Sequence, residues 1–160
     1  MKRVGLIFIV LILFMGNCTY DAVEKSETTD CSIDEIVKSR ENARALILGK
    51  WNWVQTTYNR RGIGLTTETP NSTGKVLIFK FFGNKVQILE NNNLTEETYE
   101  IKFWGEGTNT VDEILVVRFF KLTGEFQGTS LLFLNPSGTC LTLVNSYNDV
   151  NGDLKFIRAD

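Results

Sequence analysis

The sequence contains no histidine, two prolines and three cysteines. Without histidine, Ser-His-Asp and Cys-His catalytic arrangements are excluded, as are imidazole ligands for a metal. The 17 Lys and Arg residues are outnumbered by 19 Asp and Glu residues, so no basic excess indicates nucleic-acid binding. No nucleophile–base pair is visible either, and we expect a protein without catalytic activity, metal or cofactor. The length of 160 residues allows one ordinary domain.

The N-terminus has the pattern of an export signal. Lys2 and Arg3 are followed by an uncharged, almost wholly apolar run over residues 4–15. This run is shorter than the roughly 20 residues that cross a membrane, and it is typical of a secretory signal peptide. We therefore expect residues 1–17 to be removed, which changes the formal net charge from −2 to −4 because only two basic residues are lost.

The end of this run, Met15-Gly16-Asn17-Cys18, resembles the lipobox of bacterial lipoproteins. The resemblance implies that Cys18 carries a lipid and holds the protein in the bacterial cell envelope, at the outer membrane. Asn17 departs from the small residue usual before the cysteine, and ordinary signal-peptidase cleavage or an uncleaved anchor are the alternatives. The polar, acidic segment that follows gives residues 18–31 the composition of a flexible tether.

Three cysteines are an odd number for an exported protein. If Cys18 is lipidated, Cys31 and Cys140 remain as a pair. A disulfide between them would close a loop of more than a hundred residues, which is worth up to ~4–5 kcal/mol in the chain-entropy model. The alternative is two unrelated thiols, with Cys140 buried in a strand.

One amphipathic helix is expected before the sheet, over about Ser32 to Leu48. Ser32 and Glu35 have the spacing of a capping box, apolar residues follow at helical intervals, and Gly49 suits the position after a helix end. We expect the apolar side of this helix to cover part of the outer face of the sheet. The folded domain is then residues 32–160.

After Gly49, apolar and β-branched runs recur between clusters of Gly, Asn, Asp and Pro. The eight expected strands are Lys50–Tyr58, Lys75–Phe82, Lys85–Glu90, Thr95–Trp104, Glu113–Lys121, Thr129–Leu134, Thr139–Val144 and Leu154–Arg158. The absence of long helices between them excludes β-α-β units. We predict an all-β fold, an eight-stranded antiparallel up-and-down barrel, with a β-sandwich as the alternative.

The triplet Gly49-Lys50-Trp51 opens the first strand, and here the sequence resembles the lipocalins and the wider calycin group. In those families a late arginine packs over the tryptophan and closes one end of the barrel. Arg158 in the last strand matches that arginine, and a desolvated contact of this kind contributes ~2 kcal/mol. The chain looks most like small bacterial lipocalin-like lipoproteins, although it lacks a second lipocalin signature and a C-terminal helix.

The resemblance implies that the barrel binds a small apolar or amphipathic ligand. With Trp51 facing inward, strict alternation places Trp53, Gln55, Thr57 and Asn59 on the same face. The fourth strand adds Thr95 and Glu97 at one end of the row Tyr99, Ile101 and Phe103. We expect the ligand-binding residues to be Trp53, Gln55, Thr57, Tyr99, Ile101 and Phe103.

The alternative function is that of a structural or interaction subunit of an envelope complex, with large side chains filling the barrel.

Three other patterns in the sequence give weaker indications of a functional site. The segment 149–153 fits a hairpin turn better than a calcium loop, because its glycine and acidic residues are wrongly spaced. Glu96 and Glu97 are adjacent on a strand and point to opposite faces, so they do not form a glycosidase pair. The segment 59–64 is expected to be a mobile loop at the mouth of the barrel.

Overall fold

The computed structural model describes residues 31, 33–60, 64–107, 113–145 and 152–159. Nine strands and two short helices make up this part of the chain. They are α1 (Arg40–Leu46), β1 (Gly49–Arg60), β2 (Gly64–Glu68), α2 (Pro70–Thr73), β3 (Leu77–Phe82), β4 (Lys85–Glu90), β5 (Asn93–Phe103), β6 (Leu115–Lys121), β7 (Phe126–Leu134), β8 (Cys140–Val144) and β9 (Asp153–Ala159).

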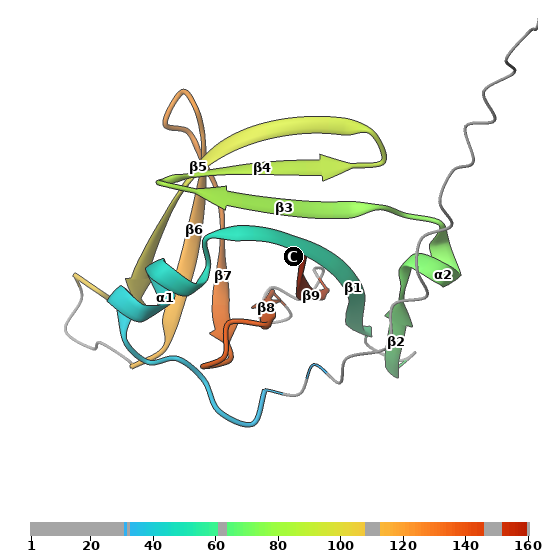
Figure 1. Ribbon diagram of the computed structural model, residues 1–160, viewed down its shortest axis with the longest axis horizontal. Coiled ribbons are helices and arrows are strands. Elements are labelled where there is room, and N and C mark those ends of the chain that lie inside the picture. Colours follow the sequence, from blue (N-terminus) through green and yellow to red (C-terminus); the bar gives the residue numbers. More distant parts are fainter. Residues whose placement is uncertain (1–30, 32, 61–63, 108–112, 146–151, 160) are drawn as a thin grey trace, which may run out of the picture.

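Eight strands, β1 and β3 to β9, form a closed antiparallel barrel. From β3 to β9 each strand pairs with the next, and β9 returns to pair with β1 over Lys50–Thr57. The long strand β5 pairs with β4 through its first half and with β6 through its second half, so it turns the sheet through a corner. Figure 1 shows β3 and β4 lying across the direction of β6 and β7. The predicted up-and-down barrel is confirmed, and closure through β9 rules out the sandwich.

The strand β2 was not expected. Residues Asn59 and Arg60 belong to β1 and Gly64 begins β2, so these two strands form a hairpin instead of a loop at this point. The residues 61–63 between them lie outside the described part. Because β9 occupies one edge of β1, the strands β3 and β2 share its other edge, β3 against Gly49–Asn52 and β2 against Thr56–Arg60.

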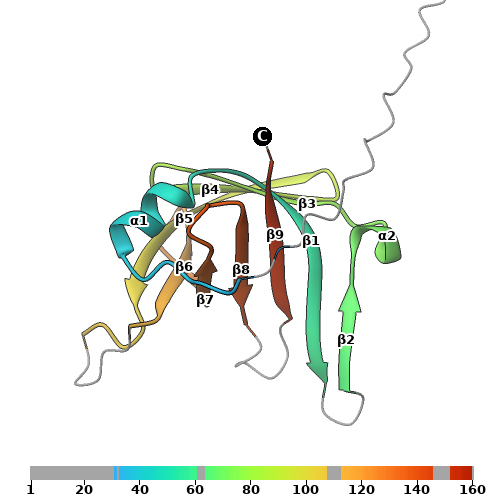
Figure 2. The ribbon, with the colours of Figure 1, turned by 60° about the horizontal axis from the view of Figure 1, so that its bottom comes forward.

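The predicted helix over Ser32–Leu48 is wrong in its first half. The helix α1 begins only at Arg40, where the Ser39 hydroxyl accepts from the Asn42 amide. Before it, the chain is held at two points of the barrel wall, because Cys31 is bonded to Cys140 and the Val37 amide donates to the Leu134 carbonyl at 2.9 Å. Figure 2 shows this segment crossing from β8 to α1. In a helix beginning near residue 32, the Val37 amide would donate to the carbonyl four residues earlier, but here it donates to Leu134 instead.

The two parts of the N-terminal segment cover different surfaces. Ile33 and Ile36 line a hollow together with Phe133 of β7, so the extended segment before α1 runs over the outer face where the sequence predicted the helix. Ala43 and Ile47 are fully buried and belong to the main apolar core, so α1 closes one end of the barrel. We call the end that α1 covers the closed end and the opposite one the open end.

Within the described residues, no helix is long and apolar enough to cross a membrane. The predicted signal peptide, Cys18 and nearly all of the tether fall outside those residues.

Candidate functional site

The closed end of the barrel is built around Trp51. Its indole is fully buried and its Nε1–H donates to the Ile47 carbonyl at 2.7 Å, which fixes α1 against β1. The guanidinium of Arg158 lies over the same indole, 4.5 Å from the ring centroid. The two residues that the sequence paired through the lipocalin resemblance therefore lie in contact.

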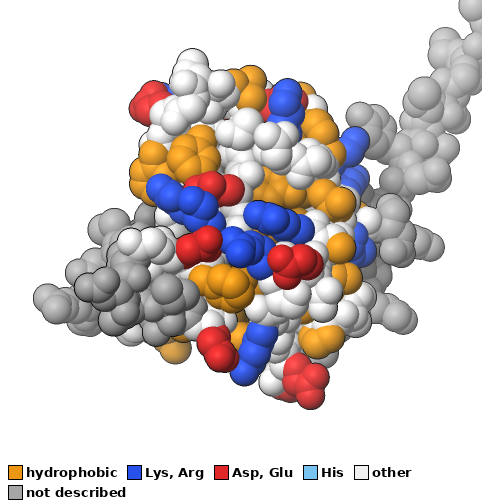
Figure 3. Space-filling model, turned by 90° about the vertical axis from the view of Figure 1, so that its left-hand side faces the viewer, with side chains coloured by type: hydrophobic (Ala, Val, Ile, Leu, Met, Phe, Trp, Pro, Cys, Tyr) orange, Lys and Arg blue, Asp and Glu red, His pale blue; other side chains and the backbone are white. Residues whose placement is uncertain are grey.

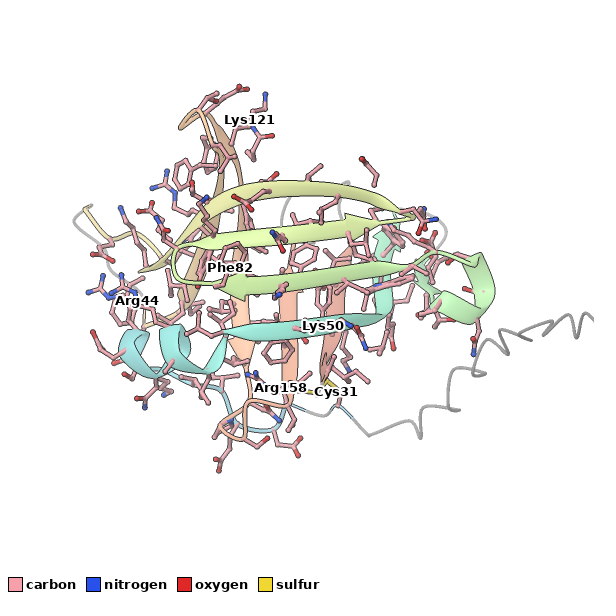
Figure 4. All side chains as sticks on the ribbon, turned by 45° about the horizontal axis from the view of Figure 1, so that its top comes forward. Cys31, Arg44, Lys50, Phe82, Lys121 and Arg158 are labelled. Carbon is pink, nitrogen blue, oxygen red and sulfur yellow. A yellow bond between two sulfur atoms is a disulfide. The ribbon has the colours of Figure 1, made fainter. Side chains whose placement is uncertain are left out.

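Arg158 also binds the backbone at three places. Its guanidinium donates to the carbonyls of Leu46, Leu48 and Gly138. The Leu46 and Leu48 carbonyls are at the C-terminal end of α1, where helix carbonyls lack partners and a positive charge is favoured. Figure 4 shows Arg158 beneath the start of β1.

Gly49 is required by this arrangement. Its φ is +117°, and a Cβ atom built there would lie 2.7 Å from Nη1 of Arg158. Any other residue would both strain the backbone and displace the guanidinium. The first residue of the Gly-Lys-Trp triplet thus makes room for Arg158.

The structure joins Cys31 to Cys140 by a disulfide, with 5.6 Å between the Cα atoms and a sequence separation of 109. Cys140 is the first residue of β8, and the bridge lies on the outer face of the barrel with both cysteines buried. It fixes the start of the described chain to the barrel wall.

The first strand does not keep one face inward along its length. The register between β1 and β9 shifts between Trp53 and Gln55, so Val54 forms a bulge. After the bulge Thr56 pairs with the inward-facing Leu154, is 4% exposed and accepts a hydrogen bond from the Trp53 indole at 2.9 Å. Gln55 is consequently turned to the outer face.

The prediction that Gln55 and Thr57 line the interior is therefore wrong, and Asn59 shares their side of the strand. The Gln55 amide instead donates to the Thr57 hydroxyl at 2.8 Å. The physical reason is the one extra residue, because a shift of one position moves every later side chain to the opposite face.

The other predicted ligand-binding residues point into the barrel, but they form its packed core toward the closed end. Trp53, Tyr99 and Ile101 are at most 8% exposed and belong to the apolar core. The Tyr99 hydroxyl donates to the Gly83 carbonyl at 3.0 Å. Phe103 lies under α1, where the Arg40 guanidinium is 5.4 Å from its ring.

A cavity of about 300 Å³ lies at the open end of the barrel. Its apolar wall comes from β3, β4 and β6, and its polar wall from β5, β7 and the residue after β8. The lining residues are Phe79, Ile88, Glu97, Phe119, Gln127, Gly128, Thr129, Ser130 and Asn145. Below it, the rings of Phe79, Phe81 and Phe156 pack at centroid distances of 4.9 to 6.0 Å and close the floor.

Most polar groups of the cavity are already paired. The Ser130 hydroxyl donates to Asn145 Oδ1 at 2.5 Å, and the Asn145 amide donates to the Gly152 carbonyl at 3.3 Å. Glu97 differs, because within the described residues its carboxylate has no hydrogen bond or ion pair. Burial raises the pKa of Glu97 above its ordinary value.

Only part of this cavity could be predicted from the sequence. Glu97 was recognised as the polar end of an inward row, and its place on β5 follows from strict alternation. The contributions of Phe119, Gly128 and Asn145 depend on which strands face each other across the open end. No local pattern carries that information.

A second hollow, of about 510 Å³, lies at the side of the closed end, between α1, the β3–β4 turn and residues 98–101 of β5. Leu48 and Phe120 supply apolar surface, and Arg44 and Glu100 supply charges. Figure 3 faces this side of the molecule and shows hydrophobic side chains among Lys, Arg, Asp and Glu.

Comparison with protein-family models finds no matching family, and searches of curated proteins and of solved structures find no matching protein.

Proposed function

We propose that this protein is an exported, lipid-anchored binding protein of lipocalin-like type. Its proposed ligand is a small apolar or amphipathic molecule held in the open half of the barrel. The observation that carries the ligand-binding part is the cavity of about 300 Å³, which combines Phe79, Ile88 and Phe119 with a few polar groups. Pockets for small molecules have this composition, and the volume is at the lower end of their usual range. The proposal assigns no catalytic role to the chain.

The cavity can be tested by filling it. Gly128 lines the cavity, and a Cβ atom built there meets nothing within 4 Å, so Gly128→Leu adds an apolar side chain to empty space. We expect the neutral fluorescent probe N-phenyl-1-naphthylamine to bind the wild-type protein saturably and to raise its melting temperature. We expect Gly128→Leu to fold and to lose this binding.

Lys80→Leu is the matched control. Lys80 is an exposed residue on the outer face of β3, so this variant adds the same side chain outside the barrel. It should bind the probe as the wild-type protein does. Absence of probe binding to the wild-type protein, or undiminished binding to Gly128→Leu, would reject a ligand cavity.

The anchoring part is supported by the sequence of residues 1–18 and is tested separately. Cys18→Ala should release the protein from membranes or leave an uncleaved precursor, seen by membrane fractionation and intact mass. Thr19→Ala, one residue further on, should change neither. An unchanged mass and membrane fraction for Cys18→Ala would exclude lipidation.

The second candidate is an interaction subunit, and one observation favours it. The hollow of about 510 Å³ beside α1 is larger than the cavity and combines apolar Leu48 and Phe120 with charged Arg44 and Glu100 on an outer surface. Surfaces of this mixed character are found at protein interfaces. If the probe does not bind and Gly128→Leu leaves all properties unchanged, the interaction subunit replaces the ligand-binding protein as the proposed function.

A further inference from the structure

The position of Glu97 in the cavity has a consequence for the kind of ligand, if the binding function proposed above holds. Glu97 is on the first half of β5 and pairs with Val86 of β4 and with Lys121 of β6. It shares the inward face of β5 with Tyr99 and Ile101, which are buried two and four residues further on. Its carboxylate therefore faces the space between the open ends of the strands and lines the cavity.

The neighbouring acidic residues all have cationic partners. Glu96 points to the outer face and accepts from Lys85 at 2.8 Å and from Gln87 at 3.2 Å. Glu100 pairs with Arg118 at 3.1 Å. Lys121, opposite Glu97 on β6, pairs instead with Glu125 at 2.7 Å. In the described part of the chain, Glu97 is left as a carboxylate with unused capacity to accept hydrogen bonds.

The surroundings of Glu97 favour a cation over an anion. No Lys or Arg is among the described residues that line the cavity, and two lining residues, Phe79 and Phe119, present aromatic rings. Aromatic faces attract cations, and a partly buried carboxylate without a partner is stabilised by one. A ligand with a carboxylate head would meet Glu97 as a like charge and would find no lining cation to compensate.

We infer that the cavity selects small molecules that carry a positively charged amine on a short apolar body, and that Glu97 binds the amine. The apolar body contacts Phe79, Ile88 and Phe119, and the ammonium donates hydrogen bonds to the Glu97 carboxylate. Charge-assisted hydrogen bonds of this kind are stronger than neutral ones, which gives the amine its advantage. A partly buried, unpaired carboxylate in a cavity is the kind of group that functional sites retain.

The test compares three probes with the same apolar chain: octylamine, which is cationic at pH 7, octanol and octanoate. Each is titrated by calorimetry and by displacement of N-phenyl-1-naphthylamine. We expect octylamine to bind about tenfold more tightly than octanol, as for a hydrogen bond to a charged group, and octanoate to bind most weakly. The advantage of octylamine should shrink as the pH falls and Glu97 becomes protonated.

Glu97→Gln keeps the size of the side chain and removes its charge. We expect octylamine and octanol to bind this variant equally, with octanol binding unchanged. Glu96→Gln is the matched control, because it makes the same change one residue away on the outer face and should leave the preference for octylamine intact.

The outcomes separate this inference from the function on which it rests. Equal binding of octylamine and octanol to the wild-type protein, or a preference that survives in Glu97→Gln, would overturn the amine selectivity while octanol binding still supports a ligand cavity. If none of the three probes nor N-phenyl-1-naphthylamine binds, the ligand-binding function and the selectivity are both rejected.

Discussion

Arg158 joins its own strand β9 to two other parts of the chain at the closed end of the barrel, residues 46–51 and the turn before β8. It covers Trp51 and donates to the carbonyls of Leu46, Leu48 and Gly138. A guanidinium has the donors for all three carbonyls in one plane, whereas a lysine ammonium has neither the planarity nor the reach to several sites. The arrangement therefore makes arginine specific at this position.

We expect Trp51→Ala to lower the free energy of unfolding by ~3–5 kcal/mol, as for a large core aromatic. Arg158→Ala should cost about 2–3 kcal/mol through its lost charged hydrogen bonds, and Arg158→Lys should recover little of this. Chemical denaturation of the two single variants and the double variant measures their coupling. Additive effects would show that the stacking contact contributes nothing of its own.

Glu97 should make stability depend on pH in a defined direction. Burial raises its pKa in the folded protein, so the folded state binds this proton more tightly than the unfolded chain does. Stability from this group is therefore highest at low pH and decreases as the pH rises through the raised pKa. Glu97→Gln removes the cost of burying the charge.

We expect Glu97→Gln to raise the melting temperature at pH 7, with the gain disappearing below the ordinary glutamate pKa of 4.5. Glu96→Gln should act in the opposite direction at pH 7, because hydrogen bonds from Lys85 and Gln87 lower the pKa of Glu96. Thermal unfolding from pH 3 to pH 8 measures both. A gain for Glu97→Gln that is the same at all pH values would exclude the charge as its cause.

At the scale of elements, the bulge at Val54 decides which side chains of β1 face the interior. Trp51 and Trp53 face inward before it, and Thr56 faces inward after it. The hydrogen bond from the Trp53 indole to the Thr56 hydroxyl spans the bulge. It gives a partner to two buried polar groups that would otherwise have none.

Deletion of Val54 would remove the extra residue and leave β1 a regular strand. Alternation from Trp53 would still place Gln55 outward opposite Lys155 and Thr56 inward opposite Leu154. Deletion of the regularly paired Asn52 would instead put Trp51 and Trp53 on opposite faces, and we expect it to lower the free energy of unfolding by about 3–5 kcal/mol, much more than deletion of Val54. Urea denaturation of the two variants compares them, and an equal or larger loss for the Val54 deletion would show that Val54 is not simply an extra residue in the strand.

A strand could be predicted where the alternation of apolar and polar residues within that strand alone is enough to identify it. The alternation of buried and less buried side chains along β3 and the row of Tyr99 and Ile101 on β5 could be predicted from the residues alone. The strand β2 could not, because Gly64–Glu68 has a single large apolar residue, Leu65, and forms by pairing with the free edge of β1.

The helix start and the cavity were misplaced for a related reason. The spacing of Ser32 and Glu35 is a genuine local helix signal, but Val37 is bonded to Leu134, nearly a hundred residues later. Likewise the bulge at Val54 depends on the pairing of β1 with β9. Local patterns cannot report contacts with the other end of the chain, so the closed end, where Gly49, Trp51 and Arg158 form a motif, was easier to predict than the cavity.

For the whole molecule, the bridge between Cys31 and Cys140 ties the N-terminal segment to the barrel across 109 residues. We expect the oxidised protein to resist alkylation at both cysteines and to take up the reagent after reduction, as measured by intact mass. Replacing both by serine should cost about 2–5 kcal/mol. Cys18→Ala should leave the stability unchanged, and two reactive thiols in unreduced protein would contradict the bridge.

The shared edge of β1 gives the two ends of the barrel unequal resistance to local unfolding. Over Gly49–Asn52 the strand is held by β3 on one side and β9 on the other, whereas over Thr56–Arg60 it is held by β2 in place of β3. In the described part of the chain β2 pairs with no strand except β1, and β9 holds this half of β1 only as far as Thr57, so the β1–β2 hairpin can separate from the barrel wall without opening the closed end. Backbone amides at the closed end should therefore exchange with solvent only on global unfolding, and those of β2 through smaller openings. The barrel would then admit a molecule through transient fraying of its less stable half while the other half keeps it folded.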